Sequence, residues 1–162
     1  MTISKKELLL RAETIRLIRQ FFNANNYLEV ETPNLIPAPA PETHIDAIRA
    51  GDLFLHTSPE LCMKRLLCAG YSHIFQISKC YRDGERGSLH LPEFTLLEWY
   101  HAGIDYFRLM EECEEMIIFL AEELGFGETI EYLDKDINLK GPWERISVDE
   151  AFQKLTRLMI KD

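Results

Sequence analysis

The sequence predicts an α+β fold in which an antiparallel sheet is flanked by helices. Three observations predict it. A helical pattern covers residues 5–24, two strand-like runs at 73–82 and 92–101 are joined by a charged loop, and a second helical pattern covers 104–124. Because these elements do not alternate regularly as strand and helix, we expect the two strands to pair as a long-looped hairpin rather than in a parallel sheet.

The first helix is predicted by its apolar spacing and by its start. Apolar side chains recur at helical spacing with basic residues between them, which is typical of a helix with one buried face. Ser4, followed by Glu7 three residues later, predicts a capping box. Asparagines end the helix, and residues 27–32 form a short strand that Pro33 stops. The apolar positions are Leu8, Leu9, Ile15, Ile18, Phe21 and Phe22.

The segment after this strand is rich in proline. Four prolines between residues 33 and 50 predict extended, irregular chain. Residues 52–56 are expected to form a strand, and residues 57–60 a turn into a helix, because proline suits a first helical turn. This helix is expected to run to about Ala69 and to end at Gly70.

The last third of the chain predicts two more helices. The helix over 104–124 is strongly acidic and ends at Gly125, and we interpret its acidic run at 111–115 as a solvated face. Residues 130–139 predict strand and turn. Ser147 and Glu150 predict a second capping box that opens the last helix.

The composition is typical of a soluble globular protein. The chain has 162 residues, of which 46% are hydrophobic and 28% charged, which suffices for one domain with a buried core. No apolar run approaches the roughly 20 residues that cross a bilayer. The N-terminus lacks a signal-peptide pattern, so we expect a cytoplasmic protein.

Charge and cysteine content argue against two further classes of function. The net charge is −9, and residues 104–162 carry most of it, so no basic face predicts RNA binding by this chain. The cysteines show neither CxxC spacing nor a histidine at ligand spacing, which argues against zinc. We expect reduced, mostly buried thiols at Cys62, Cys68, Cys80 and Cys113.

The hairpin gathers polar side chains on one face. Alternate residues of a strand share a face, so Phe75, Ile77, Tyr81, Leu97 and Trp99 are predicted to face the core. The opposite face would hold a guanidinium, a carboxylate, a phenol and a flat ring, which suit a phosphate, an ammonium group and a planar base. A plain cross-strand ion pair between Arg82 and Glu98 is the alternative. This face comprises Gln76, Ser78, Arg82, Phe94, Glu98 and Tyr100.

Three ordered segments resemble class II aminoacyl-tRNA synthetases. Residues 81–85 with 90–100 resemble motif 2, in the form found in the lysyl, aspartyl and asparaginyl enzymes. Phe21 with 27–33 resembles motif 1, and Thr57-Ser58-Pro59-Glu60 with Met63-Lys64-Arg65-Leu66 resembles the amino-acid-binding turn. The resemblance covers about residues 8–160. It implies a class II aminoacyl-tRNA synthetase/biotin synthetase-like antiparallel sheet flanked by helices, with residues 1–162 as the N-terminal part of the catalytic domain (motif 1 about 8–33, turn 57–60, motif 2 about 74–101).

Within that class the chain is most similar to the elongation factor P–lysine ligase family. The wording TSPE followed by LEWY is typical of that family, and the motif 1 helix starts almost at residue 1. The resemblance implies ATP-dependent activation of lysine or β-lysine and transfer to a lysine of elongation factor P. A lysyl-tRNA synthetase fragment, with tRNA as acceptor, and a non-catalytic dimerisation module are the alternatives. Motif 1 forms the dimer interface in this class, so a homodimer is implied.

The resemblance also implies residue roles. Arg82 matches the arginine that holds the α-phosphate of ATP and of the acyl-adenylate, where it would stabilise charge in the transition state. Phe94 matches the ring that stacks under adenine, and His90 matches a loop position near ATP. Glu60, with Ser58 beside it, matches the acceptor of the substrate amino group. The end of motif 2 supplies Glu98 and Tyr100 to the substrate pocket. The other histidines receive no role: His44, His56, His73 and His101.

Two carboxylates, Glu60 and Glu98, suit a substrate with two amino groups. A buried site of this kind rejects substrates that leave a carboxylate unpaired. The aspartyl relatives have Gln at the position of Glu60. Lysine or β-lysine is therefore the implied substrate class.

The sequence departs from the family pattern in three places. The motif 2 glutamate is displaced by one position to Glu85, which is the candidate replacement, and the asparagine after the motif 2 histidine is Leu91. Motif 3, with its γ-phosphate arginine and the carboxylates that hold Mg²⁺, has no match in residues 104–162. We therefore expect a truncated chain that does not bind ATP completely by itself.

Overall fold

The computed structural model describes residues 4–156, which divide into two compact units between Leu109 and Met110. The predicted family-like region and the domain bounds extend to residues 1–3 and 157–162, which lie outside the described residues. Within residues 4–156, no helix is long and apolar enough to cross a membrane. We describe each unit by itself.

Helix α1 (Lys5–Ala24) begins with the predicted capping box. The Glu7 amide donates to Ser4 Oγ at 3.2 Å, and the Ser4 amide donates to Glu7 Oε2 at 2.7 Å. This pairing satisfies amides that the helix itself leaves free. The helix buries Leu17, Phe21 and Phe22. The prediction for residues 5–24 is confirmed.

The main sheet is the predicted hairpin with one added strand. Strands β5 (His73–Tyr81) and β6 (Glu93–His101) are antiparallel, in a register that runs from His73↔His101 to Tyr81↔Glu93. Strand β1 (Leu28–Glu29) pairs with β5 in parallel, giving the order β1-β5-β6. The strand predicted over 27–32 was too long, because β1 lies beside β5 for two residues only. The sheet is mixed, because β1 runs parallel to β5 whereas β6 runs antiparallel to it.

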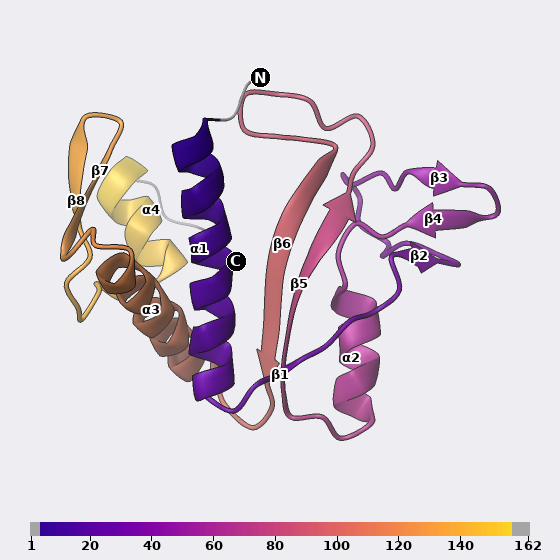
Figure 1. The fold of residues 1–162 in the computed structure, drawn as a ribbon, viewed down its shortest axis with the longest axis horizontal. Helices are drawn as coiled ribbons and strands as arrows, with labels where there is room; N and C mark the ends of the chain where they lie inside the picture. The colour runs from indigo at the N-terminus through magenta and orange to yellow at the C-terminus, as the bar shows by residue number, and fades with distance from the viewer. Residues whose placement is uncertain (1–3, 157–162) are drawn as a thin grey trace. The chain divides into compact units, whose positions relative to one another are not determined.

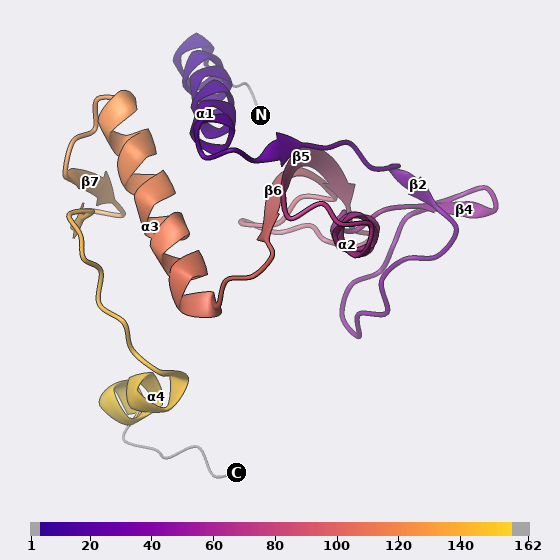
Figure 2. The same ribbon diagram turned by 90° about the horizontal axis from the view of Figure 1, so that it is seen from below.

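The two faces of this hairpin have different neighbours. Helix α1 lies on one face and α2 (Glu60–Cys68) on the other (Figures 1 and 2). On the α1 face, the Phe22 ring stacks on Phe75 with centroids 4.7 Å apart and lies 5.4 Å from Trp99. This is the face predicted to form the core.

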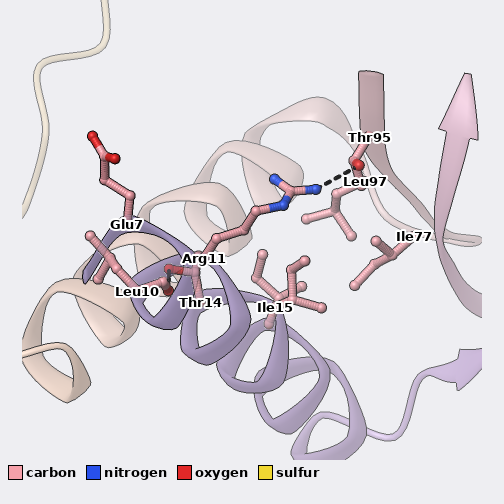
Figure 3. Close-up of a pocket in the computed structure, with 9 residues that line it drawn as sticks. Glu7, Leu10, Arg11, Thr14, Ile15, Ile77, Thr95 and Leu97 are labelled. Atoms are coloured by element: carbon pink, nitrogen blue, oxygen red, sulfur yellow. Dashed lines mark hydrogen bonds between the residues drawn. The ribbon is translucent and has the colours of Figure 1, made fainter. Parts of the chain in front are cut away.

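An open groove of about 400 Å³ separates part of α1 from the same face (Figure 3). Arg11 spans it and donates to Thr95 Oγ1 at 2.7 Å. Ile15, Ile77 and Leu97 point into it. None of the predicted site residues lines this groove, which is larger than the hollow beside Arg82 described below.

A second, smaller sheet precedes α2. Strands β2 (Leu35–Ile36), β4 (Leu53–Leu55) and β3 (Arg49–Ala50) pair in the order β2-β4-β3, all antiparallel. The strand predicted over 52–56 is confirmed as β4, whereas β2 and β3 lie in the segment predicted to be irregular. Pro59 is the N-cap of α2, and Gly70, with φ of 98°, follows its end. This left-handed backbone favours glycine.

The second unit is a helical and hairpin segment. Helix α3 (Tyr106–Glu123) begins before the division between the units, and its end leads to Gly125. Strands β7 (Thr129–Tyr132) and β8 (Lys135–Asn138) form a hairpin. Helix α4 (Val148–Thr156) has the predicted cap, with the Glu150 amide donating to Ser147 Oγ at 3.2 Å.

Two expectations about side-chain burial were wrong. Glu112 and Glu114 of the acidic run are buried, because Glu114 accepts the Trp143 amide at 3.0 Å and pairs with Arg145 at 2.6 Å. The run is therefore not a solvated face throughout. The four cysteines are free thiols as expected, but only Cys80 is buried.

Candidate functional site: a carboxylate cluster and an arginine hollow on one sheet face

The register places the predicted polar residues on the α2 side of the hairpin. Gln76 lies directly opposite Glu98, and Cys80 directly opposite Phe94. Directly opposed residues share a face, and alternation along each strand adds Ser78 and Tyr100 to it. The predicted grouping is confirmed for the strands, and Arg82 follows the last residue of β5.

A carboxylate cluster, formed by Ser58, Glu60, Glu98 and Tyr100, is built around Glu98. Its Oε2 accepts a hydrogen bond from Ser58 Oγ at 2.9 Å, and its Oε1 accepts one from Tyr100 at 2.7 Å. Burial, and then the hydrogen bond to Glu98, raise the pKa of the Tyr100 phenol well above its usual value. Tyr100 is therefore a permanent donor to this carboxylate at neutral pH.

Glu60 of the same cluster lies at the start of α2. Its amide donates to Ser58 Oγ at 3.1 Å, so Ser58 joins the two carboxylate-bearing segments. Its carboxylate accepts a hydrogen bond from Lys64, one helical turn later, and this bond raises the pKa of the Lys64 ammonium. Both partners are partly exposed, so water screens the pair.

The second cluster is a hollow of about 230 Å³ at the far end of the strands. The Arg82 guanidinium lies over the Phe94 ring, 5.0 Å from its centroid, and 3.8 Å from Glu85 Oε1. Arg82 Nε is buried and has no hydrogen-bond partner among the described residues. The hollow is lined by Arg82, Glu85, Leu89, His90, Leu91 and Phe94.

The alternative ion pair is not formed. Within residues 4–156, no salt bridge joins Arg82 to Glu98, since Glu98 lies opposite Gln76, six residues before Arg82. The eight predicted site residues instead form two clusters on one face: Ser58, Glu60, Glu98 and Tyr100, and Arg82, Glu85, His90 and Phe94.

Cys80 and His56 lie behind these clusters. Cys80 is fully buried, and burial raises the pKa of its thiol, which argues against a nucleophilic role. The fully buried His56, whose Nε2 lies 2.6 Å from the Lys79 carbonyl oxygen, was given no role from the sequence. The sequence feature that could have indicated a role for His56 is its position directly before the turn at 57–60.

The described residues offer no metal centre. No group of three or more His, Cys, Asp or Glu side chains that could hold an ion occurs in residues 4–156. The Mg²⁺ ligands that the family resemblance implies were not matched to any residue of this chain.

Comparison with known proteins decides the family. The family model described as tRNA synthetases class II (D, K and N) matches residues 2–161. The chain belongs to this family. The helices and sheets described above are consistent with the α+β fold of a class II tRNA synthetase domain.

Similar curated proteins are ligases of two kinds. The class II synthetase chain is 37% identical to the lysine–tRNA ligase of Campylobacter jejuni, over 98% of this chain and 33% of that protein. It is 38% identical to the elongation factor P–(R)-β-lysine ligase of Pseudoalteromonas translucida, over 91% of this chain and 44% of that protein. The lysine–tRNA ligase of Legionella pneumophila (strain Corby) is 35% identical over 93% of the chain. The chain spans a third to less than half of these relatives.

Proposed function

We propose that the protein carrying this chain activates lysine or β-lysine with ATP and transfers the acyl group to a lysine of elongation factor P. The carrying observation is the placement of Glu98, with its two hydrogen-bond donors, on the same sheet face as Arg82 and Phe94. A carboxylate cluster suits an ammonium group, and a guanidinium beside a ring suits an adenosine phosphate.

In the proposed first step, the substrate carboxylate attacks the α-phosphorus of ATP, and pyrophosphate leaves. Arg82 would neutralise charge on the α-phosphate during this attack. Arg82 lines the hollow and its side chain is partly exposed, so the guanidinium can donate to a phosphate oxygen that enters there. Phe94 would stack on adenine, and His90 and Glu85 would contact ATP from the same hollow.

In the proposed second step, an amine of the acceptor attacks the acyl-adenylate carbonyl, forming an amide and releasing AMP and a proton. The Mg²⁺ that accompanies ATP would offset the charge of the leaving pyrophosphate, and no residue of this chain is assigned to it. Both candidate acceptors belong to translation, so the proposed place of action is the cytoplasm.

Lysine–tRNA ligation is the second candidate. It is supported by the lysine–tRNA ligases among the similar proteins, and it uses the same activation step. The two activities differ in the acceptor. An assay of the complete gene product would distinguish them, because lysine or β-lysine would become covalently attached to elongation factor P in one case and to tRNA in the other.

We also propose a homodimer through motif 1. Helix α1 exposes Leu8, Leu9 and Leu10, of which Leu9 is 60% exposed, and a helix face of this kind suits burial against a second copy. Light scattering of the wild type and of Leu9→Glu tests this: a monomeric wild type would contradict it.

The first experiment is a thermal-shift titration of the 162-residue chain with non-hydrolysable lysyl-, β-lysyl- and aspartyl-adenylate analogues. A ligand that binds the native state raises the unfolding midpoint by mass action. We expect stabilisation by the lysine-type analogues only. Equal stabilisation by the aspartyl analogue would contradict the substrate class. No shift with any analogue would favour the non-catalytic module, and the complete gene product would then be assayed for lysine-dependent pyrophosphate exchange.

A further inference from the structure

His56 joins the chain before the substrate turn to strand β5 at two points. Its carbonyl accepts the Tyr81 amide at 3.0 Å, and its ring nitrogen Nε2 lies 2.6 Å from the Lys79 carbonyl oxygen. Its own amide donates to Asn34 at 2.9 Å. The side chain is fully buried.

These bonds complete the part of the β5 edge that, among residues 4–156, is not paired with a strand. Strand β1 pairs only with Ile74 and Phe75, and the Val30 amide then donates to the Phe75 carbonyl. Alternate residues of a strand present their hydrogen-bonding groups to the same edge, so Lys79 and Tyr81 present theirs beyond the end of β1. His56 satisfies both, one through its ring and one through its backbone.

The ring binds β5 as a hydrogen-bond donor. A carbonyl oxygen only accepts, so Nε2 carries the proton that the ring donates to Lys79. Nδ1 is buried and meets no hydrogen-bond partner in residues 4–156. The Cys80 thiol lies beside the ring, with Sγ 3.9 Å from Nε2. The imidazole is therefore a fully buried donor that holds this carbonyl in place.

The two segments joined by His56 carry the two halves of the proposed site. Ser58, two residues after His56, binds Glu98, and Glu60 follows on α2. Arg82 follows Tyr81 directly. Amino-acid activation requires the substrate carboxylate and the α-phosphate to meet at attack distance, and a displacement of about 1 Å can reduce the rate about 100-fold.

We infer that His56 is a positioning residue that fixes the spacing between the carboxylate cluster and Arg82. This inference rests on the proposed activation of lysine by ATP. The buried imidazole would then affect the rate of the reaction rather than the affinity for either substrate, because each substrate would keep its own binding contacts if the spacing changed.

Two substitutions separate this role from packing. His56→Leu removes the donor, whereas His56→Gln offers an amide N–H that can reach the Lys79 carbonyl. In the complete gene product, we expect His56→Leu to lower kcat for lysine-dependent pyrophosphate exchange about 10- to 100-fold. The KM values for lysine and ATP should change less than about 3-fold. His56→Gln should restore most of kcat.

The control for lost stability is Leu17→Ala, which removes a fully buried side chain from α1. It should lower the unfolding midpoint and leave kcat near the wild-type value below that midpoint. If His56→Leu keeps the wild-type kcat, or if His56→Gln is as impaired as His56→Leu, the positioning role is wrong.

Failure of the proposed function has a different signature. If the wild type shows no lysine-dependent exchange, amide hydrogen exchange of the 162-residue chain decides whether His56 sets the spacing. We then expect the Tyr81 and Glu60 amides to exchange at least about 10-fold faster in His56→Leu and at the wild-type rate in His56→Gln. Unchanged protection in His56→Leu would overturn the inference.

Discussion

Ser58 and Glu98, forty residues apart in the chain, are joined by a hydrogen bond of 2.9 Å from the serine hydroxyl to the carboxylate. The bond connects the turn before α2 to the centre of β6. Because Tyr100 donates to the other oxygen of the same carboxylate, Glu98 is oriented from two sides before any substrate enters. Such preorganisation lowers the cost of orienting the cluster when a ligand binds.

Glu98→Gln should remove the charge of Glu98 from this cluster while keeping its shape. The amide still accepts hydrogen bonds from Ser58 or Tyr100, but it no longer attracts an ammonium group. We expect kcat/KM for lysine in pyrophosphate exchange to fall roughly 100-fold or more. Glu93→Gln, an exposed carboxylate on the same strand, is the matched control. Unchanged turnover in Glu98→Gln would exclude the proposed role.

Arg82→Gln should weaken binding of the adenylate part of the ligand. The substitution removes the guanidinium that lies over Phe94 and that is proposed to contact the α-phosphate. We expect the thermal shift produced by the lysyl-adenylate analogue to disappear, because a charged hydrogen bond contributes about 1.5–3 kcal/mol. Arg16→Gln removes an exposed arginine on α1 and should leave the shift intact. An equal shift in both variants would contradict the assignment.

The Tyr100 phenol should make stability depend on alkaline pH. Its folded pKa is raised by burial above the value of about 10 in an unfolded chain. The stabilisation is therefore fully present below pH 10 and is lost as pH rises above 10, with a slope of at most about 1.4 kcal/mol per pH unit. Urea unfolding from pH 8 to 11 should show the stability of the wild type falling toward that of Tyr100→Phe.

Tyr132→Phe serves as the control for this titration, because Tyr132 is 58% exposed. It should keep the alkaline slope of the wild type. A difference between wild type and Tyr100→Phe that stays constant to pH 11 would show that the phenol is not held in its protonated form.

Gly141→Ala should destabilise the second unit. A Cβ at this position would overlap the Oε1 atom of Glu114, and that carboxylate cannot move freely because the Trp143 amide and Arg145 hold it. We expect a loss of about 1–3 kcal/mol. Fluorescence of Trp143 in a Trp99→Phe background reports this unit alone, since the chain has two tryptophans.

Two further variants define the cause of that loss. Gly87→Ala, where the nearest atom to a Cβ is 3.9 Å away, should have almost no effect. Glu114→Ala should suppress most of the additional effect of Gly141→Ala, because the overlapping atom is gone. Additive losses in the double variant would refute the steric explanation.

Elements with local signals could be predicted from the sequence. Helix α1 has its apolar spacing and its Ser4 cap, and the β5–β6 hairpin has two long runs of alternating residues. The short strands β1, β2 and β3 have no such signal, because each is defined by a partner elsewhere in the chain. The burial of Glu114 likewise depends on Arg145, 31 residues later.

The site shows the same division between local and distant information. Strand alternation placed Glu98 and Tyr100 on one face, and the resemblance supplied Ser58 and Glu60. Alternation alone could not decide whether Glu98 pairs with Arg82, because that depends on register, which puts Gln76 opposite Glu98. No role could be assigned to His56 from the sequence, because its contacts with Lys79 and Tyr81 depend on how two distant segments pack together.

The ion pair between Lys64 and Glu60 means that the carboxylate cluster already has a cation of its own. If lysine binds as proposed, its ammonium would arrive by exchange, displacing the resident side chain from Glu60. Both partners are partly exposed, so opening the pair costs little. Discrimination among amino acids would then depend less on Glu60, whose charge is already balanced, than on Glu98, whose neighbours are neutral hydroxyl groups.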